Sequence, residues 1–376
     1  MASSACVVHP PARLLLGPGP SPLHPRIYAA LGQPIVGHLD PYLFEVFDHI
    51  RRGLQLCWGT RNEFTYVIPG TGHAGMEAAV INFVAPGARF AVLSNGWFGE
   101  RLCDMGRRRG AQVLRCEIPW GEVFSGDEAA DFIRRERPNV VVFVHAETST
   151  GVRQDGHAIA QAAHEVGALA MADCVASLGG MPIDLDAMGV DVAFSGSQKA
   201  LGAPPGLAPI TCSPRAVEWL RARPAPVPYY LDLALIADYY GPARRYHHTP
   251  PVPMLYALRE ALAIIEEEGL DNRFARHQAN HAALVAGLEK LGLPPLAAKP
   301  HRLWTVATPR VPAGVDEALV RRSLSQNHGI EIAPGIGSLA GQILRIGTMG
   351  YGSSAENVKL LLAALEKALR EQGCIA

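Results

Sequence analysis

Seven short runs of apolar, β-branched and aromatic residues recur between residues 62 and 212, separated by segments of helical composition. The runs are residues 64–69, 89–95, 111–116, 139–145, 168–173, 191–196 and 207–212. Strands that are apolar along nearly their whole length are typical of parallel sheets, because the connecting helices bury both faces of such a sheet. We therefore expect an α/β fold with a mostly parallel central sheet covered by helices.

The chain is too long for one ordinary compact domain, since 376 residues correspond to roughly two or three domains of about 100–200 residues. Residues 10–25 contain prolines and glycines that prevent regular structure, which predicts an extended arm laid over the rest of the chain. We expect an N-terminal arm at 1–21, a large domain at 22–260 and a small C-terminal α/β domain at 261–376.

The second half of the chain supplies the elements of the smaller domain. Residues 222–252 are rich in proline and tyrosine, which predicts a long ordered loop whose aromatic side chains are packed. Residues 255–292 are helical in composition and are expected to lead out of the large domain. Strands near 303–309 and 342–348 and a closing helix at 356–372 complete the predicted small domain.

Composition and charge exclude several classes of protein. Hydrophobic residues make up 48% of the chain, enough for a sizeable core, and 34 basic residues nearly balance 35 acidic ones. This balance gives no broad surface for nucleic acid or an anionic membrane. The seven cysteines form no C-x-x-C pair, and no apolar stretch approaches the roughly 18 residues of a membrane span. We expect a cytoplasmic protein without a metal site.

One lysine stands in an unusual setting. Residues 191–206 read DVAFSGSQKALGAPPG, so an apolar strand ends in small residues and delivers Lys199 into a glycine-rich turn. A lysine after a strand is usually a solvated side chain. Here the small residues on both sides let a bulky ring approach the amine, as a Schiff-base lysine requires.

Two further features are expected at the same edge of the sheet. Asp173 ends the apolar run 168–173, and the carboxyl ends of strands are where doubly wound sheets bind ligands. The alternative is that Asp173 caps a helix. Residues 69–77, PGTGHAGME, form a glycine-rich strand-to-helix turn whose free amides suit a phosphate, although such a turn is often only a tight connection. Their convergence with Lys199 predicts a ligand site.

These motifs resemble those of the class V (fold type I) aminotransferases, specifically the alanine–glyoxylate, serine–glyoxylate and serine–pyruvate group. The resemblance covers nearly the whole chain. Its matching segments are LLLGPGPSPLHP, GHLDP, GTGHAGMEAA, NGWFGER, AETSTGV, ADCVASLGG, SGSQKALGAPPG, RYHHTPPV and LRIGTMG. It implies pyridoxal 5′-phosphate (PLP) as cofactor and PLP fold type I.

The resemblance also implies a role for individual residues. Lys199 matches the Schiff-base lysine, and Asp173 matches the partner of the cofactor's pyridine nitrogen. Phe98 matches the aromatic that stacks on the ring, and Thr148 matches the contact on the ring-hydroxyl side. The phosphate ligands of the family fall on Thr71, Gly72, His73 and Gln198, with Tyr246 and Thr249 reaching in from a second subunit.

The substrate side of the pattern contains one arginine. Arg345 matches the residue that binds the substrate carboxylate, a task suited to a planar bidentate donor. The family pattern offers no second arginine for a distal carboxylate, which favours small neutral amino donors. The implied reaction moves an amino group from alanine or serine to glyoxylate or pyruvate, by ping-pong kinetics through pyridoxamine phosphate, in a homodimer with shared active sites.

Several alternatives share the same fold and motifs. They are a 2-aminoethylphosphonate–pyruvate aminotransferase, a ureidoglycine–glyoxylate aminotransferase, a PLP-dependent lyase or desulfurase, and a catalytically silent cofactor-binding protein. A desulfurase needs a mobile nucleophilic cysteine, and no cysteine stands in an obvious exposed loop. His247 and His248 are interpreted as packing residues, and residues 266–268, three consecutive glutamates, as a solvated helix end.

Overall fold

A seven-stranded sheet forms the centre of the larger part of the molecule in the computed structural model, which describes residues 8–223 and 225–374. The strand order is β2-β10-β9-β8-β5-β3-β4, and β10 alone runs in the direction opposite to the other six strands. The predicted mostly parallel sheet is confirmed, and each of the seven apolar runs supplies one strand. The strands are β2 (Phe64–Gly70), β3 (Arg89–Ser94), β4 (Gln112–Glu117), β5 (Val140–Val144), β8 (Leu169–Asp173), β9 (Val192–Phe194) and β10 (Gly206–Cys212).

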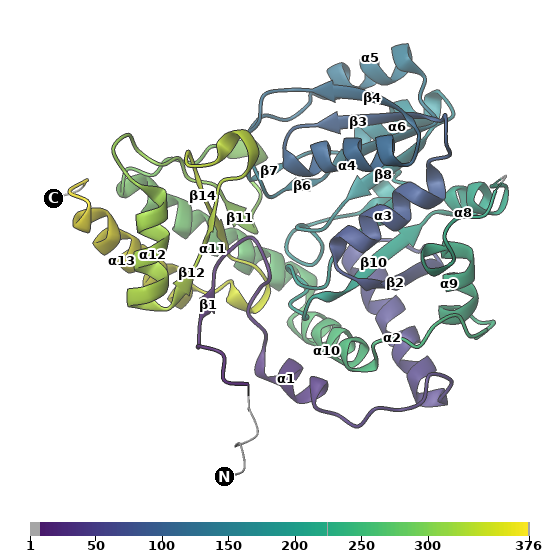
Figure 1. The fold of residues 1–376 in the computed structure, drawn as a ribbon, viewed down its shortest axis with the longest axis horizontal. Helices are drawn as coiled ribbons and strands as arrows, with labels where there is room; N and C mark the ends of the chain where they lie inside the picture. The colour runs from purple at the N-terminus through teal and green to yellow at the C-terminus, as the bar shows by residue number, and fades with distance from the viewer. Residues whose placement is uncertain (1–7, 224, 375–376) are drawn as a thin grey trace, which may run out of the picture.

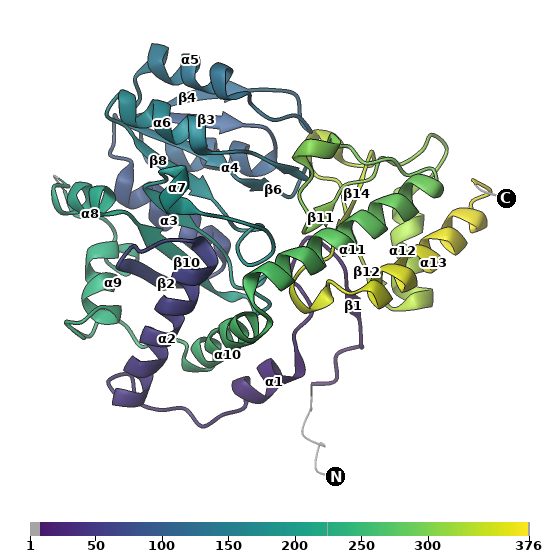
Figure 2. The same cartoon turned by 180° about the vertical axis from the view of Figure 1, so that it is seen from behind.

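Helices cover both faces of this sheet (Figures 1 and 2). On one face α3 (Gly72–Phe83) and α4 (Trp97–Arg108) pack side by side against the strands. On the other face α5 (Gly126–Glu136) and α6 (His157–Glu165) form a second pair. Burial on both sides explains why the strands are apolar along their length, and the largest hydrophobic cluster of the molecule lies here.

A helical layer closes the edge of the sheet at β2 and β10. Helix α10 (Val252–Glu268) packs against α1 (Pro25–Leu31) and α2 (Pro41–Trp58). Residues 222–252, predicted as one long loop, include the eight-residue helix α9 (Leu233–Tyr240), so this prediction is wrong in part. Helix α9 begins at Asp232, whose side chain accepts a hydrogen bond from Ala234 N.

The smaller part of the molecule is built around a three-stranded sheet, β11-β14-β13, and a second hydrophobic cluster. Helix α11 (Leu270–Lys290) leads into it and packs on α13 (Ala355–Glu371), which also contacts α12 (Glu317–His328). The helical stretch predicted at 255–292 is therefore two helices, separated at Gly269. The strands are β11 (Val306–Ala307), β13 (Ala333–Pro334) and β14 (Leu344–Gly347).

The chain passes from one core to the other along α10 and α11. The main cluster reaches Ile265 in α10, and the second cluster includes α11 from Leu284 onward. The remaining elements are short. They are α7 (Leu185–Met188), α8 (Pro214–Arg221), the hairpin β6 (Ala146–Glu147) and β7 (Val152–Arg153), and the 3-10 turns η1 (Tyr229–Leu231), η2 (Lys299–His301), η3 (Gly337–Leu339) and η4 (Gly350–Gly352).

The N-terminal arm runs between the two parts (purple in Figure 1). Its strand β1 (Leu14–Leu15) pairs with β12 (Ile330–Glu331) of the smaller part. Farther along, Ser21 N donates a hydrogen bond to Gln198 O of the larger part. The first seven residues of the predicted arm lie outside the described residues. Among the helices of residues 8–223 and 225–374, none has the length and apolar character needed to cross a membrane.

Candidate active site

Asp173 and Lys199 lie at the carboxyl edge of the central sheet, as the sequence predicts. Asp173 is the last residue of β8 and is 2% exposed. Its Oδ1 accepts a hydrogen bond from Val175 N at 2.9 Å within a turn, so it does not cap a helix. Burial raises the pKa of Asp173 to about 7, against the Val175 hydrogen bond, and the charge of Glu147 raises it further. The carboxyl group is therefore poised to bind a protonated partner.

Lys199 follows β9 and turns its amine toward the N-terminal arm. Its Nζ donates a hydrogen bond to Pro18 O. A Cβ added at Gly19 would overlap the Lys199 side chain, so the arm approaches the lysine as closely as glycine allows. Burial lowers the pKa of the amine to about 8, and Arg345 lowers it further while Asp173 opposes the shift.

The start of α3 forms a cradle beside this pair. Thr71 is the N-cap residue, but its side chain makes no capping hydrogen bond, which leaves first-turn amides free and the positive end of the helix dipole uncovered. A Cβ at Gly72 would lie 3.2 Å from Val175, and the backbone of Gly196 packs against Gly72. Gln198 Oε1 is buried without a hydrogen-bond partner among the described residues. The cradle therefore has polar groups to offer an anion.

Seven of the residues assigned by resemblance line one enclosed cavity of about 80 Å³. The cavity reaches from the start of α3, past the end of β8, to Lys199. Its hydrocarbon walls include Met76 and Val175. The seven residues are Gly72, His73, Phe98, Thr148, Asp173, Gln198 and Lys199.

A second cavity, of about 360 Å³, adjoins the first and shares Lys199, His73, Phe98 and Thr148 with it. Arg345 on β14 lines it from the smaller part of the molecule. The Arg345 Nε donates to Pro334 O at 2.7 Å, and no acidic side chain pairs with the guanidinium within residues 8–223 and 225–374. Burial lowers the Arg345 pKa, and Glu147 opposes that shift. This cationic fork is available to a ligand.

Arg101 also lines the second cavity, which the sequence analysis did not foresee. Its Nη1 lies 3.2 Å from His73 Nε2, and its guanidinium lies over the ring of Trp97 at 5.8 Å. Burial lowers the pKa of His73, and the charges of Arg101 and Lys199 add to this. The spacing in NGWFGER could have indicated this position. Arg101 follows Phe98 by three residues, and residues three apart on a helix lie on the same face.

Glu147 is a second residue that the sequence analysis left without a role. It is fully buried on β6, and its carboxylate accepts hydrogen bonds from Phe98 N and from Ser149 N and Oγ. Ser149 Oγ in turn accepts from Trp97 N at 2.9 Å. Since Gly96, the N-cap residue of α4, has no side chain, Glu147 and Ser149 cap this helix from the β6–β7 hairpin.

A comparison with families of known proteins assigns the chain. The model of the aminotransferase class-V family matches residues 26–361. The chain belongs to the class V aminotransferases. The resemblance inferred from the motifs is thereby confirmed, as is the fold type I architecture, which solved structures of this class share.

Characterised members of the class are similar over nearly their whole length. Alanine–glyoxylate aminotransferase of Callithrix jacchus is 40% identical over 365 residues, covering 96% of this chain and 88% of the relative. Alanine–glyoxylate aminotransferase from Nostoc sp. superimposes with a TM-score of 0.96 at 46% identity, covering 98% of both chains. Ureidoglycine–glyoxylate aminotransferase from Bacillus subtilis gives a TM-score of 0.95 at 37% identity, covering 97% and 95%.

Three residues expected at the phosphate of this class V aminotransferase, Thr71, Tyr246 and Thr249, line neither cavity of their own chain. Tyr246 and Thr249 are exposed. Tyr246 Oη lies 3.4 Å from Thr249 Oγ1, and the Tyr246 ring lies 4.7 Å from that of His38. The neighbouring His247 and His248 are buried, and burial lowers the His248 pKa to about 4, which agrees with a packing role.

Proposed function

We propose that this class V aminotransferase transfers the amino group of a small amino acid, alanine or serine, to glyoxylate or pyruvate, with PLP as cofactor. The observation that carries the proposal is the convergence of Asp173, Lys199 and Arg345 on two adjoining cavities. Two of the relatives described above are named alanine–glyoxylate aminotransferases, which supports the substrate class.

PLP fits the polar groups around the smaller cavity, and when bound it supplies an electron sink for negative charge at the substrate α-carbon. Thr71, Gly72 and His73 would hold the phosphate with the free amides of α3. Gln198 would join them, since a ligand there would give its buried amide oxygen a partner.

The ring of the cofactor would lie between hydrocarbon and polar walls of the same cavity. Phe98 lines this cavity and would stack on the ring. Its backbone is held in place by the hydrogen bond from its N–H to Glu147. Thr148 would contact the ring-hydroxyl side. Asp173 would pair with the pyridine nitrogen and keep it protonated, which a buried carboxylate achieves without competition from water.

Lys199 would bind the cofactor covalently and, once displaced by the amino acid, act as general base at the substrate α-carbon. A pKa of about 8 leaves a usable neutral fraction of the amine near neutral pH. The lysine lines both cavities, so it stands between the cofactor side and the substrate side. The ping-pong sequence expected of this enzyme requires that position.

Arg345 would bind the substrate carboxylate and orient the α-carbon toward Lys199. Its guanidinium faces the larger cavity with Nε committed to Pro334 O, which leaves the terminal nitrogens for a bidentate contact. Arg101 is a second arginine at this cavity, and its position was not predicted from the sequence. Because His73 and Trp97 hold its guanidinium, we assign Arg101 to the phosphate end of the site and keep small neutral donors as the preferred substrates.

The active unit would be a homodimer, in which Tyr246 and Thr249 reach the phosphate of the partner subunit. An exposed apolar and aromatic surface supports this, because patches of this kind are typical of subunit interfaces. Tyr239 Oη donates to His38 O, which joins the segment around residues 35–42 to that around 239–249. The exposed side chains of this surface are Ile35, Leu39, Tyr42 and Tyr246.

The test is an activity matrix of amino donors against 2-oxo acid acceptors with purified protein. Alanine or serine with glyoxylate or pyruvate is expected to give the highest kcat/KM. The Bacillus subtilis relative makes ureidoglycine the second candidate donor, and 2-aminoethylphosphonate tests the third. Release of sulfide or ammonia without transamination would indicate a lyase, although no described cysteine lines either cavity.

A further inference from the structure

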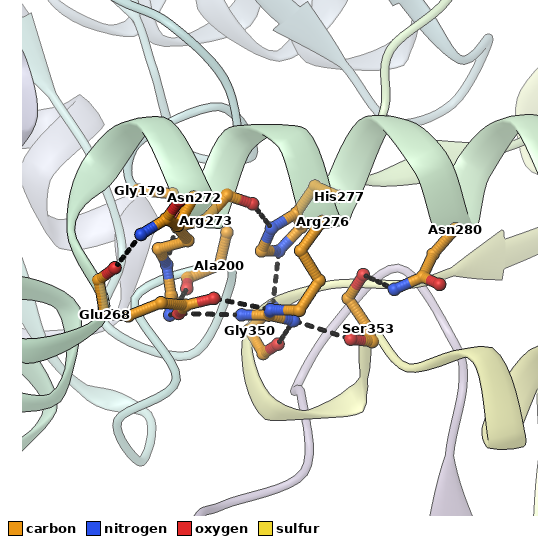
Figure 3. A network of polar contacts seen from close by, with 10 residues as sticks. All are labelled: Gly179, Ala200, Glu268, Asn272, Arg273, Arg276, His277, Asn280, Gly350 and Ser353. Carbon is orange, nitrogen blue, oxygen red and sulfur yellow. Dashed lines mark hydrogen bonds and ion pairs between the residues drawn. The ribbon is translucent and has the colours of Figure 1, made fainter.

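Arg273, near the start of α11, is buried at the junction between the two parts of the molecule (Figure 3). Its side chain is 4% exposed. Its Nε donates to Gly179 O at 2.7 Å, and its Nη2 donates to Ala200 O at 2.6 Å. Its Nη1 donates to Glu268 Oε2 at 2.8 Å. Every nitrogen of the guanidinium therefore has a partner.

The two carbonyl groups bound by Arg273 belong to the segments that carry the proposed catalytic pair. Ala200 directly follows Lys199, and Gly179 lies in the turn that follows Asp173. These segments leave two different strands, β9 and β8. One guanidinium thus spans the two segments behind the active site, with charge-assisted bonds that are shorter and stronger than neutral ones.

Arg276, one turn further along α11, extends the same network into the smaller part of the molecule. It donates to Gly350 O and Ser353 O, and its Nε and Nη2 bind both oxygens of Glu268. His277 Nε2 accepts from Gly350 N at 3.0 Å, while Nδ1 donates to Arg273 O. The segment 348–353 directly follows β14, which carries Arg345.

Glu268 joins the two arginines and is not the solvated helix end that the sequence suggested. Burial alone would raise its pKa, but the hydrogen bonds and charges of Arg276 and Arg273 outweigh burial and hold the pKa below its ordinary value. Burial lowers the pKa of His277 to about 3, so its ring is neutral and keeps one donor and one acceptor nitrogen. Within this network Arg273 is buried, whereas the side chains of Glu268 and Arg276 are 23% and 31% exposed.

We propose that Arg273 is a positioning residue that sets the placement of Lys199 relative to Asp173, and that Arg276 sets the placement of Arg345. Both act through backbone carbonyls, with Glu268 as common counter-ion, and neither lines the two cavities of the site. The inference rests on the proposed function, because the three positioned residues are those to which it gives roles. It predicts that the two arginines, three residues apart on one helix, affect different steps.

The first test measures hydrogen exchange of backbone amides in the holoenzyme and in cofactor-free protein. Arg273→Gln is expected to speed exchange in peptides covering 174–181 and 199–203, and to leave 348–354 near the wild-type rate. Arg276→Gln is expected to do the reverse. Arg259→Gln is the matched control, since Arg259 lies on α10 with a partly exposed side chain and contacts only Glu260 among acidic groups.

The second test measures kcat and KM separately with alanine and glyoxylate. Arg273→Gln is expected to lower kcat by about 10- to 100-fold with little change in the KM for alanine, because displaced catalytic groups act on the chemical step. Arg276→Gln is expected to raise the KM for alanine mainly. Arg273→Lys, which keeps the charge but reaches fewer acceptors, is expected to fall between wild type and Arg273→Gln.

Glu268 keeps one arginine in each single variant, so neither leaves it unpaired and both are expected to fold. Faster exchange spread evenly over the molecule, identical effects of the two variants, or wild-type exchange in 174–181 and 199–203 would each overturn the proposal. If the wild-type protein does not transaminate alanine but the two variants show their separate exchange patterns, the proposed function fails and the positioning network stands.

Discussion

The carboxylate of Glu147 accepts a hydrogen bond from the backbone N–H of Phe98 at 2.9 Å. Glu147 is the last residue of β6 and directly precedes Thr148, and Phe98 is the second residue of helix α4. The contact fixes the start of α4 next to β6, and in this position Phe98 lines both cavities. A Cβ at Gly96 would overlap Glu147, so the start of α4 lies as close to β6 as a glycine at position 96 permits. The aromatic ring that we propose to stack on the cofactor is therefore held in place by a buried acid.

Replacing Glu147 with Gln should loosen this contact, because an amide carries one acceptor where the carboxylate carries two. We expect cofactor binding to weaken about fivefold, which corresponds to about 1 kcal/mol, the typical value of a helix cap. Titration of cofactor-free protein by visible absorbance measures it. Asp104→Asn, on the exposed side of α4, is the control and should bind as the wild type does. Unchanged affinity in Glu147→Gln would remove the anchoring role.

Replacing Lys199 with Ala should abolish the yellow absorbance band of the lysine-bound cofactor. Weak cofactor binding should persist, because Thr71, His73 and Gln198 do not depend on the lysine. Absorbance spectra, equilibrium dialysis and single-turnover assays measure the two effects. A variant that kept wild-type turnover would show that another group carries out the proton transfer.

The sequence predicts the positions of residues that lie at or just after the end of a single strand. Asp173 and Lys199 follow apolar runs, and parallel strands bring such ends to one edge of the sheet. It missed Arg101, Glu147 and Arg273, whose partners come from other elements. Glu268 illustrates the cause. Three consecutive glutamates look solvated in sequence, and only the turn between α10 and α11 places Arg273 and Arg276 on the third of them.

The burial of Asp173 predicts a pH dependence of stability in the cofactor-free protein. Its pKa rises from 3.8 to about 7 on folding, so the folded state holds a proton that the unfolded state has released between these values. The protonated Asp173 carboxyl group therefore contributes to the free energy of unfolding at low pH, and this contribution is lost as the pH rises through 7. The Asp173→Asn variant has no ionisable group at this position, so its free energy of unfolding does not show this decrease.

We expect the stability of Asp173→Asn relative to wild type to improve by about 1–3 kcal/mol between pH 5 and pH 8, since one pKa unit corresponds to about 1.4 kcal/mol. Denaturant unfolding at both pH values measures it. The same variant should bind cofactor but lose most activity, because the amide cannot hold the proton of the pyridinium. A stability difference that is constant with pH would show that Asp173 does not titrate in this range.

The proposed sharing of active sites between two subunits predicts complementation between two inactive variants. Lys199→Ala removes the lysine of its own chain, and Tyr246→Ala with Thr249→Ala removes the proposed phosphate contacts to the partner. In a mixed dimer one site then has both defects and the other has neither, so activity should reappear on unfolding and refolding the two variants together. Sedimentation of each variant alone should show a dimer.

The matched control mixes Lys199→Ala with Asp173→Asn. Each of these changes damages the cavity of the chain that carries it, so both sites of a mixed dimer stay defective and no activity should reappear. If the Tyr246 and Thr249 variant is fully active, or if the wild-type protein is an active monomer, the shared site is rejected. Recovery in the control mixture would show that the observed activity comes from another cause.

Substrate choice depends on what the two arginines of the larger cavity hold. Arg345 has terminal nitrogens free for one carboxylate, whereas Arg101 is engaged by His73 at 3.2 Å and by the face of Trp97. A distal carboxylate of glutamate or aspartate would therefore be poorly paired, at a cost of about 1–3 kcal/mol. We expect kcat/KM for alanine and serine to exceed that for glutamate or aspartate with 2-oxoglutarate at least about tenfold, which corresponds to about 1.4 kcal/mol.

Variants of the two arginines separate these roles. Arg345→Lys should lower kcat/KM for every amino acid tested, because a point charge cannot replace the bidentate fork. Arg101→Gln should weaken cofactor binding and leave the ratio of alanine to glutamate within about twofold of wild type, a change below about 0.5 kcal/mol. A wild-type preference for glutamate that disappears in Arg101→Gln would place the distal carboxylate on Arg101 and reverse the assignment, and an unaffected Arg345→Lys enzyme would remove the carboxylate from Arg345.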